Sequence, residues 1–483
     1  MMNKNSYRFQ YLLGLLMLVG IGLVQAQNAK PNILVVLCDD LGYADVGFNG
    51  SKDIVTPHLD KLAKGGAHFT SAYVAHPFCG PSRAALFTGR YPHVIGTPFN
   101  LRDDGVKTDD GVPTNEVYIS NVLHDAGYYT GIVGKWHLGY ADQFHPNNRG
   151  FDDFYGFLGG GHNYFPEQFS PLYEKQAKAG VYPIREYIKP LQHNGKWVQE
   201  KEYVTDGLSR EAMGMIKGAA SNKKPFFLYL AYNAPHVPLE AKEEDLKHFA
   251  HIKDKDRRTY AAMVYAVDRG VGEIVKVLKE TNQYDNTLIV FLSDNGGNFD
   301  HGANNEPLKG TKGDTFEGGY RVPMFMHWPG KITAGSQFDF PVTSLDLYPT
   351  FAHLAGAQIP KGKKLDGKNI IEKVIKGENP RPNEMIYALR YRFGYTDVGA
   401  RMDDWKATRV ANEPWQLFNI KNDIGEKHDL SKRFPDRLAK MVQQTQEWSK
   451  THVQPLWWYY DKEAVMWKQG LTPNYKETFS IDE

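Results

Sequence analysis

Four runs of consecutive apolar residues stand out along the chain, at 32–38, 128–133, 225–231 and 287–292. A run without polar alternation is typical of a strand with both faces buried, as in a parallel sheet. Helical spacing of apolar positions separates these runs, for example at 118–126 and 258–280. The alternation predicts an α/β fold, with a large domain whose mainly parallel sheet lies between helices.

The composition changes around residue 361 and again at 377–382, which indicates a linker. Beyond it, the pattern predicts a smaller C-terminal α+β domain with a short antiparallel sheet. Its expected strands lie at 385–389, 405–410 and 415–419, and its helix at 435–449. We therefore expect an N-terminal domain at 27–376, the smaller domain at 383–450 and a C-terminal segment at 451–483. This segment is rich in aromatic residues, as expected of a strap packed on the large domain or of a sugar-stacking surface.

The N-terminus has the features of an export signal at 1–26. Lys4 and Arg8 precede an apolar run at 11–24, and Ala26 ends a cleavage-like pattern of small residues. The run is short for a membrane-spanning helix, although an uncleaved anchor stays an alternative. No later stretch is apolar for long enough to cross a bilayer, so the mature protein is expected to have no stable membrane span. We expect export to the periplasm or secretion.

Charge and cysteine content narrow the class of protein further. The 483 residues include 57 basic and 56 acidic ones, for a net charge of +1. A nucleic-acid-binding protein would normally have a strong basic excess, so no nucleic-acid partner is expected. The 2 cysteines are too few for a disulfide scaffold. A single Cys38–Cys79 bridge or two inert thiols are the simplest interpretations of them.

Polar side chains follow each of the four predicted strands. In chain order they are Asp39 and Asp40, then Lys135 and His137, then His236, and finally Asp294 and Asn295. In open α/β sheets, binding sites form at the carboxyl ends of the strands. One such strand end would be weak evidence, because Asp and Asn often cap turns. Four together predict a single site.

A further group of chemically active residues begins at Cys79. Pro81 is suited to the first position of a helix and Gly89 to its end. This would put Cys79 at the positive end of the helix, where an anion is favoured. Arg83, one turn further on, would add a permanent positive charge for oxyanions.

The stretch from Cys79 to Arg90 has the pattern Cys-x-Pro-x-Arg followed by Thr-Gly-Arg. It resembles the signature of the type I, formylglycine-dependent sulfatases, which belong to the alkaline-phosphatase superfamily and have an alkaline-phosphatase-like fold. In that family a formylglycine-generating maturation enzyme oxidises the cysteine during biogenesis. The resemblance implies that Cys79 becomes formylglycine and that one hydroxyl of its hydrate attacks sulfur.

The resemblance extends to a metal site. The residues around Asp39 and Asp40 are similar to the family's first metal-binding strand, and those around Asp294 and Asn295 to its second. The implied ligands are these four side chains and the formylglycine derived from Cys79. Oxygen ligands of this kind suit one Ca²⁺ ion, with Mg²⁺ less favoured. The residues show no Cys/His spacing for zinc.

Family blocks also imply roles in proton transfer. Around Lys135 and His137 the chain is similar to a block in which the histidine removes the proton of the second formylglycine hydroxyl and the lysine binds hydrate and sulfate oxygens. His236 resembles the acid that protonates the leaving group, a role suited to a histidine. Lys312 matches the lysine that lies against the scissile oxygen. Glu317 and Arg321 are expected to hold the Lys312 loop.

The substrate pocket is less clearly indicated. After the block at 150–153, many relatives have a sulfate-binding side chain, whereas this chain has three glycines followed by His162 and Asn163. Either residue is a candidate substitute. Further candidate substrate-binding residues are Lys309, which is also consistent with a solvated loop charge, and Arg390 and Arg392 in the smaller domain.

The favoured function is hydrolysis of sulfate esters of an oligo- or polysaccharide. The chain looks like bacterial polysaccharide sulfatases, and ulvan, carrageenan, fucoidan, chondroitin and heparin fragments are all possible substrates. One alternative is a phosphomonoester, phosphodiester or phosphonate hydrolase of the same superfamily, although such relatives commonly use a Thr or Ser nucleophile and two zinc ions. A catalytically inactive carbohydrate-binding homologue is the alternative from another class.

Overall fold

The computed structural model describes residues 30–102 and 109–471, together with Phe479. The predicted export signal at 1–26 lies outside these residues. Within this part of the chain, no helix combines the length and the apolar character needed to cross a membrane.

The larger of two sheets has 11 strands in the described residues, in the order β10-β2-β9-β8-β1-β7-β3-β4-β5-β6, with β11 also paired to β2. Its centre, β8-β1-β7-β3, is parallel throughout and consists of the four predicted apolar runs. Strand β9, which the pattern analysis missed, is antiparallel to both β8 and β2. The strands are β1 Asn32–Cys38, β2 Ala67–Tyr73, β3 Tyr129–Lys135, β4 Asp153–Phe157, β5 Leu191–His193, β6 Lys196–Val198, β7 Phe226–Ala231, β8 Thr287–Ser293, β9 Arg321–His327, β10 Ser336–Phe338 and β11 Val342–Thr343. The predicted mainly parallel α/β sheet is confirmed.

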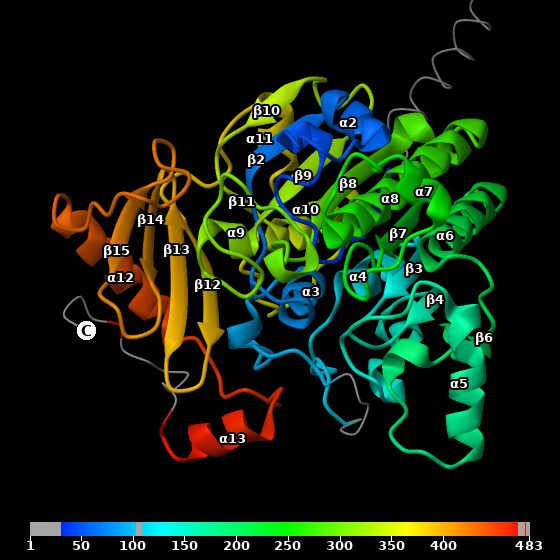
Figure 1. The fold of residues 1–483 in the computed structure, drawn as a ribbon. Helices are drawn as coiled ribbons and strands as arrows, with labels where there is room; N and C mark the ends of the chain where they lie inside the picture. The colour runs from blue at the N-terminus through cyan, green and yellow to red at the C-terminus, as the bar shows by residue number, and fades with distance from the viewer. Residues whose placement is uncertain (1–29, 103–108, 472–478, 480–483) are drawn as a thin grey trace, which may run out of the picture.

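Helices cover both faces of this sheet (Figure 1). Along β1, Ile33, Val35 and Leu37 face one hydrophobic core, and the residues between them face the other. Helices α3, α4 and α10 contribute to the first core, and α2, α6 and α8 to the second. Burial on both faces explains why the central strands are continuously apolar. The helices of this part are α2 Pro57–Lys64, α3 Cys79–Thr88, α4 Ile119–Asp125, α5 Pro166–Lys178, α6 Val204–Ser221, α7 Glu243–Lys247, α8 Lys255–Glu280, α9 Glu317–Tyr320, α10 Leu347–Leu354 and α11 Ile371–Lys376.

The second sheet is antiparallel and stands beside the large one, in orange in Figure 1. Its strands are β12 Met385–Tyr391, β13 Thr396–Met402, β14 Trp405–Arg409 and β15 Gln416–Asn419. Helix α12, Pro435–Ser449, packs on this sheet and has the predicted bounds. Helix α13, Asp461–Lys468, lies in the aromatic-rich segment. The predicted antiparallel sheet is therefore confirmed, with β13 as an additional strand. The domain boundaries at 376 and 383 stay predictions.

Two helices begin earlier than the sequence pattern predicts. Helix α3 starts at Cys79, so that Pro81 is its third residue and not its first. Proline is tolerated there because the N–H groups of the first turn have no partners within the helix. Helix α8 starts at Lys255, because the carboxylate of Asp254 caps it by accepting a hydrogen bond from the Arg257 N–H at 2.7 Å.

Candidate active site

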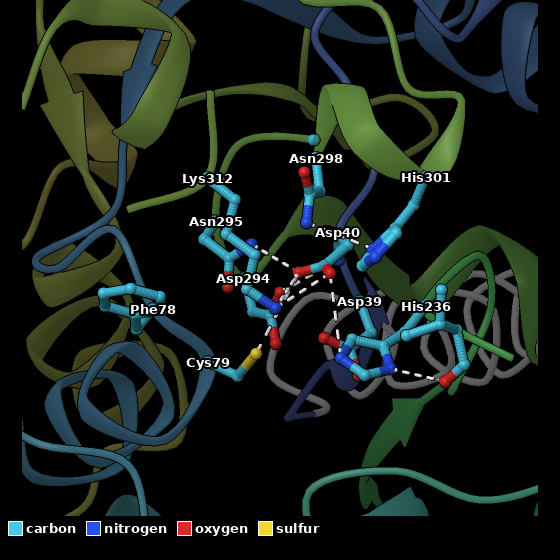
Figure 2. Close-up of polar contacts among 12 residues, drawn as sticks. Asp39, Asp40, Phe78, Cys79, His236, Asp294, Asn295, Asn298, His301 and Lys312 are labelled. Atoms are coloured by element: carbon cyan, nitrogen blue, oxygen red, sulfur yellow. Dashed lines mark hydrogen bonds and ion pairs between the residues drawn. The ribbon is translucent and has the colours of Figure 1, made fainter. Parts of the chain in front are cut away.

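The carboxyl ends of four neighbouring parallel strands bring the predicted polar side chains together. Asp39 follows β1, Lys135 ends β3, His236 lies beyond β7 and Asp294 follows β8. Because these strands are adjacent in the order β8-β1-β7-β3, their side chains meet at one edge of the sheet. Figure 2 shows Asp39, His236 and Asp294 of this cluster around Asp40.

Asp40 lies at the centre of this cluster. One of its carboxylate oxygens, Oδ1, is 2.7 Å from Lys312 Nζ and accepts a hydrogen bond from Asn295 Nδ2, also at 2.7 Å. The other, Oδ2, is 3.7 Å from His236 Nε2. Burial is the largest single influence and opposes ionisation of Asp40. The charges of Lys312 and His236 and the hydrogen bonds from Lys312 and Asn295 together outweigh it and keep the pKa of this carboxyl below its usual range. Asp40 also has a φ of 63°, in the left-handed region that a non-glycine residue seldom adopts.

A second set of buried charges lies beside Asp40 and consists of two ion pairs. Lys135 Nζ lies 2.5 Å from Asp39 Oδ2, and Arg83 donates from Nε to Asp294 Oδ2 at 2.8 Å. Arg83 also donates to the carbonyl of Lys135 at 3.0 Å, which joins helix α3 to strand β3. These residues are completely or almost completely buried, so each charge depends on its partner. Arg83 is thus a counter-ion of Asp294, and its anion-binding role stays a prediction.

Cys79 lies at the first position of α3 with its Sγ 4.0 Å from Asp40 Oδ1. It is not bonded to Cys38, so the disulfide alternative is excluded. Burial, reinforced by the negative charge of Asp39, raises the pKa of the Cys79 thiol well above its ordinary value. An unmodified thiol in this position would be protonated at neutral pH and therefore a poor nucleophile.

Two histidines flank this cysteine. His236 donates its Nδ1 proton to the Val237 carbonyl at 2.7 Å, which leaves Nε2 facing Asp40. Burial lowers the pKa of His236 to about 3, although the Asp40 carboxylate opposes the shift. His137 is buried and has a φ of 63°. Two strained non-glycine residues, Asp40 and His137, thus occupy one site, as is common where geometry serves function.

The oxygen atoms of the cluster fit a hard cation. Ligand atoms of Asp39, Asp40, Cys79 and His236 lie within 4.8 Å of one another. Asp39 Oδ1 and Asn295 Oδ1 are buried and have no hydrogen-bond partner among the described residues. A buried acceptor without a partner is costly unless something satisfies it. Carboxylate and amide oxygens of this kind match the ligands that Ca²⁺ or Mg²⁺ prefers.

A cavity of about 660 Å³ opens over this cluster. It is lined by six of the predicted residues, namely Cys79, His137, His236, Lys312, Arg390 and Arg392. Its other lining residues are His76, Phe78, Pro98, Phe99, Asn100, Leu101, Gly160, Tyr187, Asn298, His301, Tyr391, Phe393, Tyr395, Tyr459, Tyr460 and Glu463. The cavity therefore lies between the large sheet, the end of β12 and the C-terminal segment.

Three predicted substrate-binding residues are not on the wall of this cavity. The ring of His162 is buried, and its two nitrogens lie 2.7 Å and 2.8 Å from the carbonyl oxygens of Asn163 and Lys189. Lys309 is exposed and its ammonium group covers the ring of Phe316. Two backbone carbonyls therefore engage both ring nitrogens of His162. In this region the wall contains Gly160 in place of His162 and Asn163.

The sequence reasoning missed several cavity residues. Asn298 and His301 follow closely after the Asn295 motif, and their side chains are 3.1 Å apart beside Asp40 in Figure 2. Their closeness in sequence to Asn295 could have indicated that they lie near the site. Tyr459 and Tyr460 belong to the aromatic segment that the sequence pattern indicated, but the pattern did not place these two residues at the cavity.

The aromatic C-terminal segment packs on the large domain and also reaches the cavity, while its sugar-stacking role stays a prediction. Trp457 is buried and donates from Nε1 to the carbonyl of Phe99 at 3.0 Å, so the segment packs on the large domain. Immediately after this anchor, Tyr459 and Tyr460 line the cavity. Packing and an exposed aromatic surface are therefore compatible.

A buried ion network ties the Lys312 loop to the second sheet. Lys406 of β14 lies 3.2 Å from Glu317 Oε1 and 2.9 Å from Glu426 Oε1, and all three side chains are inaccessible to solvent. Glu317 also accepts hydrogen bonds from Tyr73 and Arg321, at 2.7 Å and 3.0 Å. Although burial opposes it, the charge of Lys406 leads the interactions that lower the pKa of Glu317 to about 2. Glu317 and Arg321 thus occupy the supporting positions predicted for them.

Lys406→Met is expected to lower the free energy of unfolding by about 3–5 kcal/mol, because it leaves two buried carboxylates without their shared cation. Chemical denaturation followed by tryptophan fluorescence measures this. Lys421→Met, at an exposed lysine of the same part of the chain, is the matched control and should change stability by less than about 0.5 kcal/mol. Equal stability of the two variants would show that the network contributes little.

Comparison with known proteins identifies related chains. The model of the family "Sulfatase" matches residues 31–357, and the model "N-sulphoglucosamine sulphohydrolase, C-terminal" matches residues 312–452. N-acetylgalactosamine-6-sulfatase of Mus musculus is 31% identical over 491 residues, which cover 91% of this chain and 90% of that protein. The uncharacterized sulfatase YdeN of Escherichia coli is 36% identical over 396 residues, covering 71% of this chain and 66% of that protein, just under two thirds of its length.

Solved structures agree with these matches. The crystal structure of Ps i-CgsB is 59% identical, with a TM-score of 0.92 over 94% of this chain and 100% of that one. The same protein in complex with k-i-k-neocarrahexaose matches with a TM-score of 0.90 over 91% of this chain and 97% of that one. The phosphonate monoester hydrolase of Agrobacterium radiobacter, at 19% identity and a TM-score of 0.63 over 88% of this chain and 96% of that one, shares the fold alone.

Proposed function

Since the chain belongs to the sulfatase family, we propose that it removes sulfate from a carrageenan-type polysaccharide or its oligosaccharides. The reaction class, hydrolysis of a sulfuric ester, follows from the family and its relatives. One observation carries the choice of site: Cys79 begins a helix beside Asp40, at the inner end of a cavity with a cationic wall.

The proposed nucleophile is residue 79 after oxidation of its cysteine by a maturation enzyme. As formylglycine, this residue would supply a hydrated aldehyde, one hydroxyl of which attacks sulfur while the other allows sulfate to be expelled afterwards. The start of α3 favours the negative charge that develops there, because the first N–H groups of a helix point outward. The suppressed acidity of the unmodified thiol supports a modified residue in this role.

We propose that Asp39, Asp40, Asp294 and Asn295 hold one Ca²⁺ ion together with residue 79. The two buried acceptor atoms without partners, on Asp39 and Asn295, support this assignment. Bound there, the cation would polarise the sulfate and orient the attacking hydroxyl. Lys135 and Arg83 would balance the remaining carboxylate charge.

His236 and Lys312 are the proposed proton donor and electrostatic partner of the leaving oxygen. Both contact the same Asp40 carboxylate and both line the cavity. Burial holds His236 neutral, but a sulfate ester that enters beside it adds negative charge, which favours the imidazolium form. His137, on the wall next to Cys79, is the proposed base for the second hydroxyl.

The likeness to Ps i-CgsB supports a carrageenan-type substrate in particular. That relative has been crystallised with k-i-k-neocarrahexaose, and it matches 91% of this chain at 59% identity. The exposed aromatic side chains at the cavity mouth, including Phe393 and Tyr460, suit stacking against sugar rings. The pattern at 1–26 supports export, which would bring the enzyme into contact with a polymer outside the cytoplasm.

The test combines mass spectrometry with a substrate panel. In protein made with a competent maturation enzyme, the peptide that contains Cys79 should be lighter by the difference between a thiol and an aldehyde. Free sulfate, measured by ion chromatography, should appear with carrageenan oligosaccharides and at a lower rate with ulvan, fucoidan, chondroitin and heparin fragments. An unmodified Cys79 in active protein would refute the mechanism, and a preference for another glycan would refute the substrate.

A further inference from the structure

The wall of the cavity carries positive charge on the side of the smaller sheet as well as beside Asp40. Of its lining residues, Lys312, Arg390 and Arg392 carry a permanent positive charge at neutral pH. Lys312 is paired with Asp40, as described above. The two arginines come from the end of β12 and from the residue after it, so they belong to the smaller sheet.

The two arginines differ in whether a carboxylate contacts them directly. Arg392 hydrogen-bonds to Asp397 and lies 3.5 Å from Asp314. Arg390 donates from Nη1 to the carbonyl of Gly313 at 2.8 Å, and no ion pair within 4.0 Å is found for it among the described residues. Burial and the like charge of Arg392 lower the pKa of Arg390 to about 10. Asp397 and Asp314 act on Arg390 only from a distance, so its guanidinium keeps donor groups that an anion could engage directly.

The carboxylate on the wall does not form a direct ion pair with Arg390, although its charge acts on that arginine from a distance. Glu463 is the only carboxylate among the described lining residues. It accepts a hydrogen bond from the Tyr460 N–H at 2.9 Å, and burial raises the pKa of its carboxyl. The wall is thus suited to an anionic ligand.

Arg390 belongs to the smaller sheet but lies close to Cys79 of the large domain. Its guanidinium covers the ring of Phe78 at 4.6 Å, and Phe78 directly precedes Cys79. Its hydrogen-bond acceptor, Gly313, directly follows Lys312. Arg392 lies two residues further along the chain, about 7 Å in an extended strand. This separation is on the scale of one sugar ring.

Aromatic side chains continue the wall beyond the arginines. Phe393 is 40% exposed and Tyr460 is 54% exposed, and their ring centroids are 6.1 Å apart. Exposed rings beside guanidinium groups suit a sugar that carries an anionic substituent better than a free inorganic ion.

We propose that Arg390 and Arg392 form a subsite for a second sulfate group, carried by the sugar next to the one that bears the scissile sulfate. This inference rests on the proposed function and specifies its substrate class as glycans with at least two sulfates on neighbouring sugars. Arg390 provides the main charge, because Asp397 already engages Arg392.

The experiment compares two oligosaccharides that share the scissile sulfate and differ only in the sulfate on the neighbouring sugar. The wild-type enzyme should have a kcat/KM at least about 10-fold higher for the doubly sulfated one, as expected of a charge-assisted contact. In Arg390→Gln this ratio should fall toward one, and Arg390→Lys should restore part of it. Arg392→Gln should reduce the ratio less, and Arg433→Gln, at an exposed arginine outside the cavity wall, should leave it unchanged.

The possible results separate this inference from the proposed function. Release of sulfate from neither compound by the wild-type enzyme would overturn the proposed function. Equal kcat/KM values for the two compounds would overturn the subsite alone. If Arg390→Gln lowers kcat/KM equally for both compounds, Arg390 acts on the scissile sulfate or on folding. That result would also overturn the proposed subsite.

Discussion

Cys79→Ala is expected to lower kcat/KM for sulfate release by at least about 10⁴-fold, because it removes the proposed nucleophile and leaves only substrate binding and charge stabilisation. Alanine is a good helix former, so α3 should still begin at this position. The measurement is the initial rate of sulfate release at subsaturating substrate. Circular dichroism and thermal unfolding establish that the variant is folded.

Cys38→Ala is the matched control, because Cys38 is the other buried cysteine and packs in a hydrophobic core. Its substitution should cost about 1 kcal/mol of stability and leave the reaction within a few fold of the wild-type rate. Residual activity of Cys79→Ala within about 100-fold of wild type would contradict the proposed nucleophile.

Asp40→Asn is expected to lower kcat/KM by at least about 10³-fold, equivalent to roughly 4 kcal/mol of transition-state stabilisation. The substitution removes the charge that faces Lys312 and His236 and weakens the proposed cation site. Asparagine accepts positive φ as readily as aspartate, so the left-handed backbone at this position should be retained. The effect then reports charge and not backbone strain.

Asp403→Asn is the control for this substitution. Asp403 has a φ of 49° and is an exposed hydrogen-bond acceptor in the turn between β13 and β14. Its variant should keep activity within about two-fold. Calorimetric titration of chelator-treated protein should show binding of Ca²⁺ by wild type and by Asp403→Asn, and much weaker binding by Asp40→Asn. Restoration of activity by Zn²⁺ but not by Ca²⁺ would contradict the proposed metal.

Local pattern was sufficient for the centre of the fold. The strands at 32–38, 225–231 and 287–292 were predicted because burial on both faces forces continuous apolar sequence. Strand β13 was not predicted, because charged residues occupy some of its buried positions. Arg401 in this strand is buried, as is Asp397, so neither fits an apolar or alternating pattern.

The polar cluster at the strand ends could be predicted, whereas most of the cavity wall could not. Asp39, Asp40, Asp294 and Asn295 follow strands whose parallel order brings their ends together. The wall depends on contacts between distant parts of the chain, such as Tyr460 with the end of β12, and neither segment indicates the other. The position of His162 depends on a distant contact in the same way, since the carbonyl of Lys189 engages one of its ring nitrogens.

The network around Lys406 has a consequence for engineering. Its three charges lie on the Lys312 loop, on β14 and beyond β15, and Arg390 approaches the same loop from β12. The C-terminal sheet therefore cannot be replaced on its own by the sheet of a relative in order to change the sugar preference. A chimera would have to exchange residues 309–317 and the sheet as one piece, because a mismatched junction would disturb catalysis and recognition together.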